Sequence, residues 1–147
     1  MFSKILVPVD GSDTSFRAFD AALFLSEKLA SQVTAVHVMD KEPNMYVPTD
    51  NYVDSQKILD ELRGAYESEE QKMLTKYSQL ADRKGITTNS VLLEGDPASV
   101  ILNYAQKENY DVIIMGNRGL GSFKRLVVGS VSNKILHNSP CPVLLMK

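Results

Sequence analysis

Five short runs rich in β-branched and apolar residues are spaced along the chain and separated by segments with helical periodicity. The runs cover residues 5–9, 33–39, 87–93, 111–115 and 142–146. The first run and the last two are almost continuously apolar, which is typical of strands covered by helices on both faces. This alternation of strand and helix favours an α/β fold with one open, doubly wound parallel sheet and right-handed crossovers. Ligands of such sheets bind beyond the carboxyl ends of the strands, where the strand order reverses.

The segments between the runs carry recognisable helix signals. Ser12 or Asp13 can cap a first helix, and Asp96-Pro97 supplies a cap and a first-turn proline for a later one. A Gly-Ser pair precedes a further helical pattern over residues 131–137. These signals place a helix between successive strands at both ends of the chain.

The middle of the chain holds its longest helical pattern. Residues 54–84 place apolar side chains near helical spacing, and the pattern stops at Lys84-Gly85. We expect one long helix there, covering an edge of the sheet. Residues 41–51, which include two prolines, predict an irregular loop before it. The 147 residues contain no linker or repeat, so we expect a single domain spanning residues 1–147.

Composition excludes several classes of function. The formal net charge of -2 provides no basic field for a nucleic-acid backbone. No run is long enough to span a bilayer, and the first residues lack the features of a signal peptide, so we expect a cytoplasmic protein without a membrane partner. Cys141 is the only cysteine and predicts packing rather than a reactive thiol. His37 and His137 show no metal-ligand spacing, so no protein metal site is expected.

Glycine and hydroxyl residues follow the fourth apolar run in two clusters. Gly116 and Gly119 come directly after the run, and Gly129, Ser130 and Ser132 open the next helical pattern. Glycines allow backbone N–H groups to approach phosphate oxygens, and a helix amino terminus adds unpaired N–H groups. The pattern therefore favours a polyphosphate ligand. The alternative is that these glycines only form tight turns.

These clusters also resemble a known signature. The spacing Gly116-x-x-Gly119, nine residues, then Gly129-Ser130 is similar to the ATP-binding signature of the universal stress protein family. Further landmarks of that family are matched by residues 5–12, 36–38, 94–97 and 139–145. The resemblance implies a Rossmann-like fold, related to the adenine nucleotide alpha hydrolases, with a five-stranded sheet in the order 3-2-1-4-5. It also implies an ATP site between the first and fourth strands.

The same resemblance implies which residues form this site. The adenosine side would be formed by Pro8, Val9, Asp10 and Val38. The ribose and phosphates would be contacted by Met115, Gly116, Arg118 and Gly119. The phosphate chain would be covered by Gly129, Ser130, Val131 and Ser132. The ligand would be ATP, ADP or AMP. Mg²⁺ could accompany it through the phosphates near Ser130.

Two of these residues, Asp10 and Arg118, could also have roles other than ligand binding. On spacing alone, Asp10 is as well suited to cap the first helix as to accept hydrogen bonds from a ribose or an adenine amino group, and the resemblance favours the ligand. Arg118 could pair with phosphate or remain solvated. Lys124 and Arg125 could guide an anion inward, although a solvated role is more typical of such loop residues.

Four classes of function can be compared with this sequence. The first is a dimeric nucleotide-sensing regulatory module, and the second is a slow ATP hydrolase, although the chain has neither a P-loop nor a kinase signature. A phosphoacceptor receiver domain fits poorly, because the third run ends at Glu94-Gly95 without an acceptor aspartate. The fourth is a dimerising interaction domain without a ligand. By the resemblance, Val143, Leu144 and Leu145 lie on an edge strand that pairs two copies into a homodimer.

Overall fold

Strands and helices alternate along the whole of the computed structural model, which describes residues 2–39, 41, 52–119 and 128–147. In chain order the elements are β1 (Lys4–Pro8), α1 (Asp13–Leu29), β2 (Gln32–Met39), α2 (Tyr52–Arg83), β3 (Asn89–Glu94), α3 (Pro97–Lys107), β4 (Val112–Gly116), α4 (Ser130–Asn138) and β5 (Val143–Met146). The expected loop at 41–51 lies outside the described residues, apart from residue 41.

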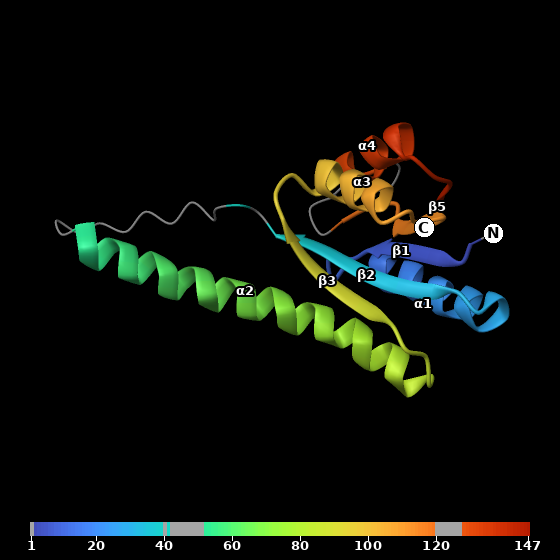
Figure 1. Cartoon of the computed structure of the whole chain (residues 1–147), viewed down its shortest axis with the longest axis horizontal. Coiled ribbons are helices and arrows are strands. Elements are labelled where there is room, and N and C mark those ends of the chain that lie inside the picture. The colour runs from blue at the N-terminus through green and yellow to red at the C-terminus, as the bar shows by residue number, and fades with distance from the viewer. Residues whose placement is uncertain (1, 40, 42–51, 120–127) are drawn as a thin grey trace.

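All five strands form one parallel sheet in the order β3-β2-β1-β4-β5. Helices α1 and α2 cover one face of this sheet, and α3 and α4 cover the other (Figure 1). The predicted α/β class, strand order and placement of helices on both faces are therefore confirmed. Because β1 and β4 are neighbours whose connections leave in opposite directions, their carboxyl ends form the point where the strand order reverses.

The core lies on both faces of the central strands. Side chains of β1 and β4 alternate between two buried apolar clusters, so that Val7 packs against α1 and α2 while Leu6 packs against α3 and α4. Both residues are completely buried, as is every residue of β4 to within a few per cent. Burial on two faces explains why these strands read as continuous apolar runs.

Local hydrogen bonds fix where the helices begin. The Ser12 side chain accepts a hydrogen bond from the Ser15 amide and caps α1. Asp96 caps α3 in the same way through the Ser99 amide, with Pro97 in the first turn. The cap of α1 is thus Ser12, one of the two predicted residues, and the alternative reading of Asp10 as the cap is wrong.

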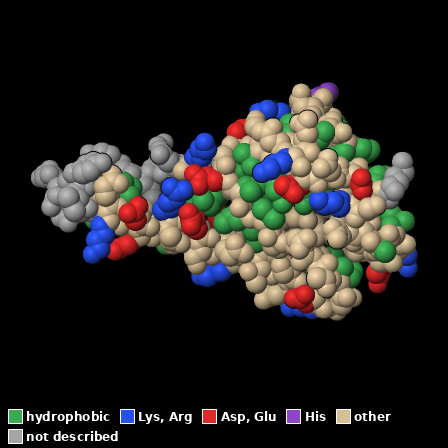
Figure 2. Space-filling view, viewed as in Figure 1, with side chains coloured by type: hydrophobic (Ala, Val, Ile, Leu, Met, Phe, Trp, Pro, Cys, Tyr) green, Lys and Arg blue, Asp and Glu red, His purple; other side chains and the backbone are tan. Residues whose placement is uncertain are grey.

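Helix α2 is the longest element, with 32 residues spanning about 48 Å at 1.5 Å per residue. Its carboxyl-terminal half buries Leu74, Tyr77 and Ala81 against α1 and the sheet, whereas Ile58 and Leu62 nearer its start are 37% and 40% exposed. Figure 1 shows this first half extending beyond the sheet, and Figure 2 shows acidic and basic side chains interspersed along it. No helix in the described part of the chain has the length and apolar character needed to cross a bilayer.

Candidate functional site

A cavity of about 350 Å³ opens at the carboxyl ends of β1 and β4, within the usual size range for small-molecule sites. It is lined by Pro8, Val9, Asp10, Ser15, Val36, His37, Val38, Pro97, Ile101, Met115, Gly116, Arg118, Gly119, Gly129, Ser130, Val131 and Ser132. All twelve residues assigned to a nucleotide site from the sequence are in this set. The structure therefore brings together segments that lie more than a hundred residues apart in the chain.

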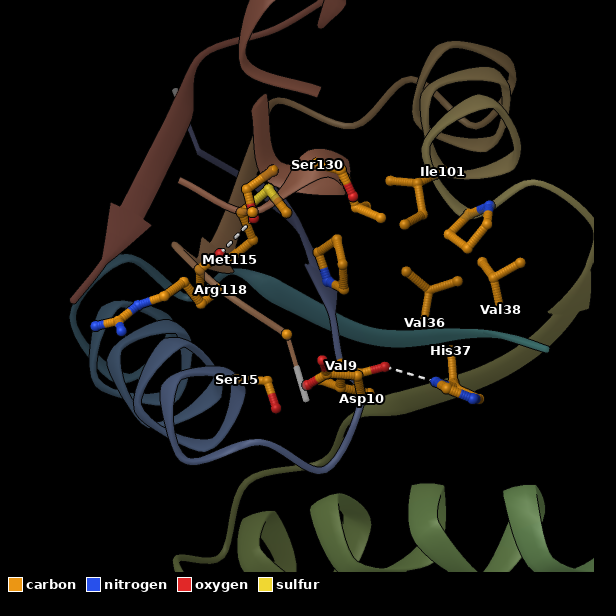
Figure 3. A pocket seen from close by; sticks show the side chains of 17 residues that line it. Val9, Asp10, Ser15, Val36, His37, Val38, Ile101, Met115, Arg118 and Ser130 are labelled. Carbon is orange, nitrogen blue, oxygen red and sulfur yellow. Dashed lines mark hydrogen bonds between the residues drawn. The ribbon is translucent and has the colours of Figure 1, made fainter. Parts of the chain in front are cut away.

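One half of the cavity is apolar. Val36 and Val38 lie two residues apart on β2 and so point to the same face of the sheet, where Ile101 of α3 lies across from them (Figure 3). Pro97, one turn before Ile101, continues this wall. A flat apolar group such as a nucleobase fits a slot of this composition.

The opposite half is formed by two glycine corners, residues 116–119 and residues 129–132. The Gly129 amide donates a 2.8 Å hydrogen bond to the Asn117 carbonyl oxygen, which joins the two corners directly. The buried Ser132 hydroxyl donates a 2.9 Å hydrogen bond to the Gly116 carbonyl oxygen and holds the start of α4 against the end of β4. The predicted convergence of the two corners is confirmed.

The second glycine corner presents the amino terminus of α4 to the cavity. Gly129 is the N-cap and has no side chain to satisfy the first amides of the helix. Ser130, Val131 and Ser132 all line the cavity, and amides of a first turn have no acceptor within their own helix. The positive end of the helix dipole therefore favours a negatively charged group at this end of the cavity.

The Asp10 carboxylate lies on the far side of the cavity from Ser130 (Figure 3). Its Oδ1 accepts hydrogen bonds of 3.0 Å from the Ser12 amide and 2.5 Å from the Ser12 hydroxyl. Its Oδ2 lies close to the first glycine corner, because a Cβ built on Gly119 would be only 2.6 Å away from it. One oxygen thus orients the side chain, and the other is held at the cavity wall.

Comparison with known proteins agrees with this architecture. The family model described as the universal stress protein family matches residues 1–147. The chain belongs to the universal stress protein family. Universal stress protein YxiE of Bacillus subtilis is similar at 33% identity, with both chains fully covered. A universal stress protein of Methanocaldococcus jannaschii is also 33% identical, over the whole of this chain and 83% of its own length.

Solved structures of universal stress proteins share the fold. That of UspA from Lactobacillus plantarum superposes with a TM-score of 0.82 at 26% identity, covering 99% of this chain and 98% of that one. A universal stress protein in complex with cAMP has a TM-score of 0.71 at 21% identity, covering 99% of this chain and 97% of that one. The protein from Archaeoglobus fulgidus in complex with dAMP has a TM-score of 0.69 at 18% identity, with both chains fully covered. The last two comparisons show a common fold.

The Arg118 side chain of this universal stress protein does not point toward the start of α4, where a phosphate group is expected. It lines the cavity, but its guanidinium points away from the other labelled side chains (Figure 3). Its carbonyl oxygen accepts a 2.7 Å hydrogen bond from the Thr14 hydroxyl, so its backbone is fixed to α1. Within the described residues its Nε atom is buried without a hydrogen-bond partner. Lys124 and Arg125 lie outside the described residues.

Five lining residues were not assigned from the sequence: Ser15, Val36, His37, Pro97 and Ile101. Two of them carried a usable signal, since Val36 shares a strand face with Val38 and Pro97 opens a capped helix after a strand. The His37 ring is held between two oxygens: its Nδ1 lies 2.7 Å from the Val9 carbonyl oxygen and its Nε2 lies 2.7 Å from Glu70 Oε2. The described residues contain no group of three His, Cys, Asp or Glu side chains that could hold a metal ion.

Ser15 is connected to the outer helix layer through Tyr77 of α2. The Tyr77 hydroxyl lies 2.7 Å from the Ser15 hydroxyl and accepts a 3.0 Å hydrogen bond from the Gly11 amide. Its ring is fully buried and stacks on Phe16 with a centroid separation of 4.4 Å. A tyrosine hydroxyl keeps its proton at neutral pH, and burial raises the pKa of Tyr77 further, so the group can donate a hydrogen bond as well as accept one.

Proposed function

We propose that this universal stress protein binds an adenine nucleotide, ATP or its relatives ADP and AMP, and acts as a nucleotide-sensing regulatory module. The observation that carries the proposal is the convergence of the two glycine corners, with the amino terminus of α4, at the reversal point of the sheet. Two structural relatives that share the fold are complexes with cAMP and dAMP, which supports an adenine nucleotide as the ligand.

The two halves of the cavity match the two halves of such a ligand. The base would occupy the apolar slot formed by Val36, Val38 and Ile101, and the phosphates would accept hydrogen bonds from the amides at the start of α4. Asp10 would accept a hydrogen bond from the ribose or the adenine amino group. Mg²⁺ would be held by phosphate oxygens, with the Ser130 hydroxyl nearby, because the described side chains do not supply a cation site of their own.

The residues that line this cavity are better suited to binding ATP as a sensor than to hydrolysing it rapidly. Catalysis of phosphate transfer requires a group that positions the attacking water and cationic groups that stabilise the transition state. The carboxylate among the described lining residues, Asp10, is engaged with Ser12, and the His37 ring is engaged with Val9 and Glu70. We therefore expect bound ATP to persist in the cytoplasmic protein and to report nucleotide levels through occupancy.

Direct analysis of bound nucleotide tests the proposal. Freshly purified protein is denatured, and released small molecules are identified by mass spectrometry. We expect an adenine nucleotide in near-stoichiometric amount, and calorimetric titration of nucleotide-free protein with ATP should give saturable binding. GTP in the same titration reports whether the base is recognised. Absence of binding by ATP, ADP and AMP at millimolar concentration would overturn the proposal.

The exposed edge of the sheet supports a homodimer as the assembled form. Strand β5 pairs with β4 along one side, and no strand of the described chain pairs with its other side. Val143 and Leu145 are partly buried, whereas Leu144 is 43% exposed. An apolar edge of this kind favours pairing with a second copy, so we propose that Val143, Leu144 and Leu145 form the dimer contact.

Replacement of Leu144 tests this interface. We expect Leu144→Glu to convert the dimer to a monomer, because two glutamates would approach each other across the symmetric contact. Leu62→Glu is the matched control, since Leu62 is 40% exposed but lies on α2 rather than on β5. Sedimentation velocity at micromolar concentration reports the mass. A monomeric wild-type protein, or a dimeric Leu144→Glu variant, would contradict the proposal.

A further inference from the structure

Helix α2 does not line the cavity, yet it contacts the turn that carries Asp10. This turn, residues 10–12, connects β1 to α1 and will be called the β1–α1 turn. At its centre Gly11 has a φ of +80°, a conformation that glycine adopts readily and other residues rarely do. Within the turn, Asp10 Oδ1 accepts hydrogen bonds from Ser12, and contacts from outside the turn fix its position against the outer helix layer.

Tyr77 supplies the most direct of these contacts. Ser15 donates its single hydroxyl proton to the Ser12 carbonyl oxygen at 2.8 Å, so the proton between Tyr77 and Ser15 must come from the tyrosine. Since the Tyr77 oxygen also accepts from the Gly11 amide, one chain of hydrogen bonds runs from Gly11 through Tyr77 and Ser15 to Ser12. This chain connects Gly11, at the centre of the β1–α1 turn, to Ser12, its last residue.

Glu70 provides a second contact, seven residues before Tyr77 and on the same face of α2. Its carboxylate lies 2.7 Å from His37 Nε2, while His37 Nδ1 faces the Val9 carbonyl oxygen. The carboxylate therefore orients the imidazole ring that holds the residue directly before Asp10. Both bridging side chains are largely buried, with exposed fractions of 13% for His37 and 21% for Glu70.

We propose that Tyr77 and Glu70 are positioning residues for the nucleotide site. They fix the β1–α1 turn, and with it the Asp10 carboxylate, so that the cavity is organised before the ligand arrives. This inference rests on the proposed nucleotide-binding function. Its consequence is that α2, on the outside of the sheet, sets the affinity of a cavity that it does not touch.

The variant Tyr77→Phe tests the first contact, because it removes only the hydroxyl and keeps the ring stack on Phe16. We expect the dissociation constant for ATP to rise about fivefold, as is typical for loss of one hydrogen bond. Hydrogen exchange of the Gly11 amide, followed by NMR, should accelerate in the same variant. Tyr104→Phe is the matched control, since Tyr104 is paired with Tyr110 at the amino-terminal end of β4 and should leave the ATP affinity unchanged.

The variant Glu70→Ala tests the second contact, and Glu69→Ala is its control. Both remove one carboxylate from the same turn of α2, but Glu69 pairs only with Lys72 at the surface among the described contacts. We expect about a threefold rise in the ATP dissociation constant for Glu70→Ala, the size of one modest hydrogen bond, and no change for Glu69→Ala. Thermal unfolding of each variant is measured alongside.

The outcomes separate the inference from the function on which it rests. Wild-type protein that fails to bind ATP, ADP and AMP overturns both. Normal ATP affinity in Tyr77→Phe and Glu70→Ala, with or without a lower thermal midpoint, overturns the positioning role alone and leaves the nucleotide site intact. Weaker ATP binding in these two variants, unchanged binding in both controls and faster exchange at Gly11 support it.

Discussion

Replacing Gly116 by alanine should both destabilise the protein and abolish measurable nucleotide binding. A Cβ at this position would lie 2.6 Å from the Thr14 hydroxyl oxygen and 2.9 Å from the Thr14 carbonyl carbon, so helix α1 itself would have to move. Overpacking of this kind costs about 1–3 kcal/mol of the free energy of unfolding. The shift would also disturb the hydrogen bond from Thr14 to the Arg118 carbonyl oxygen, which fixes the first glycine corner.

The variant Gly129→Ala is the control for the clash at Gly116, because it also adds one methyl group to a cavity glycine but without a close contact. A Cβ on Gly129 would meet the Arg118 Cα at 3.5 Å, an ordinary contact, and its φ of -61° is allowed for any residue. Its free energy of unfolding should stay within about 0.5 kcal/mol of the wild-type value. Urea denaturation gives both stabilities, and calorimetry gives the ATP affinity of Gly116→Ala. Equal stabilities for the two variants would show that the close approach of Gly116 to α1 is not a constraint.

Replacing Asp10 by alanine should raise the dissociation constant for ATP roughly 10- to 100-fold, the range expected for losing hydrogen bonds to a charged acceptor. The carboxylate is the group that the cavity presents opposite the start of α4, and its loss also releases the Ser12 side chain that caps α1. Titration with ATP measures the effect. Adenosine in a parallel titration should show a similar relative loss, because the proposed contact is to the nucleoside rather than to the phosphates.

Asp13→Ala is the matched control for charge. Asp13 lies three residues away, in the first turn of α1, and does not line the cavity. Its removal changes the net charge by the same amount, so any general electrostatic effect on an anionic ligand should be equal in both variants. Similar ATP affinities for Asp10→Ala and Asp13→Ala would contradict a direct role of Asp10 in ligand binding.

The part of the cavity that the sequence predicted is the part formed by short segments next to strand ends. Strands β1 and β4 are revealed by continuous apolar runs, and the residues that follow such strands meet at one edge of the sheet by the rules of α/β topology. Boundaries moved by one or two residues: β4 includes Gly116 because its backbone pairs with Met146, and β1 ends at Pro8 rather than Val9. The family signature supplied the identity of the remaining positions.

The contacts of α2 could not be predicted in the same way. Helical spacing predicted the helix that contains Tyr77, but the partners of Tyr77, Gly11 and Ser15, are more than sixty residues away in the chain. Which residues meet across two packed layers depends on how far the helix slides along its axis, and periodicity carries no information about that. His37 illustrates the same limit, because its role depends on Glu70, which no local pattern distinguishes from the neighbouring glutamate Glu69.

The uneven burial of α2 divides it into two parts that differ in how readily they open. The turns around Leu74, Tyr77 and Ala81 are anchored in the interior, whereas Ile58 and Leu62 are exposed. We therefore expect the turns around Ile58 and Leu62 to open locally more readily than the anchored ones. Within α2, limited digestion with trypsin should therefore cut after Lys57 before it cuts in the anchored turns. The anchored half of α2 also carries Tyr77 and Glu70, so a partner bound to the exposed turns would be connected through one continuous helix to the side chains that contact Gly11 and His37.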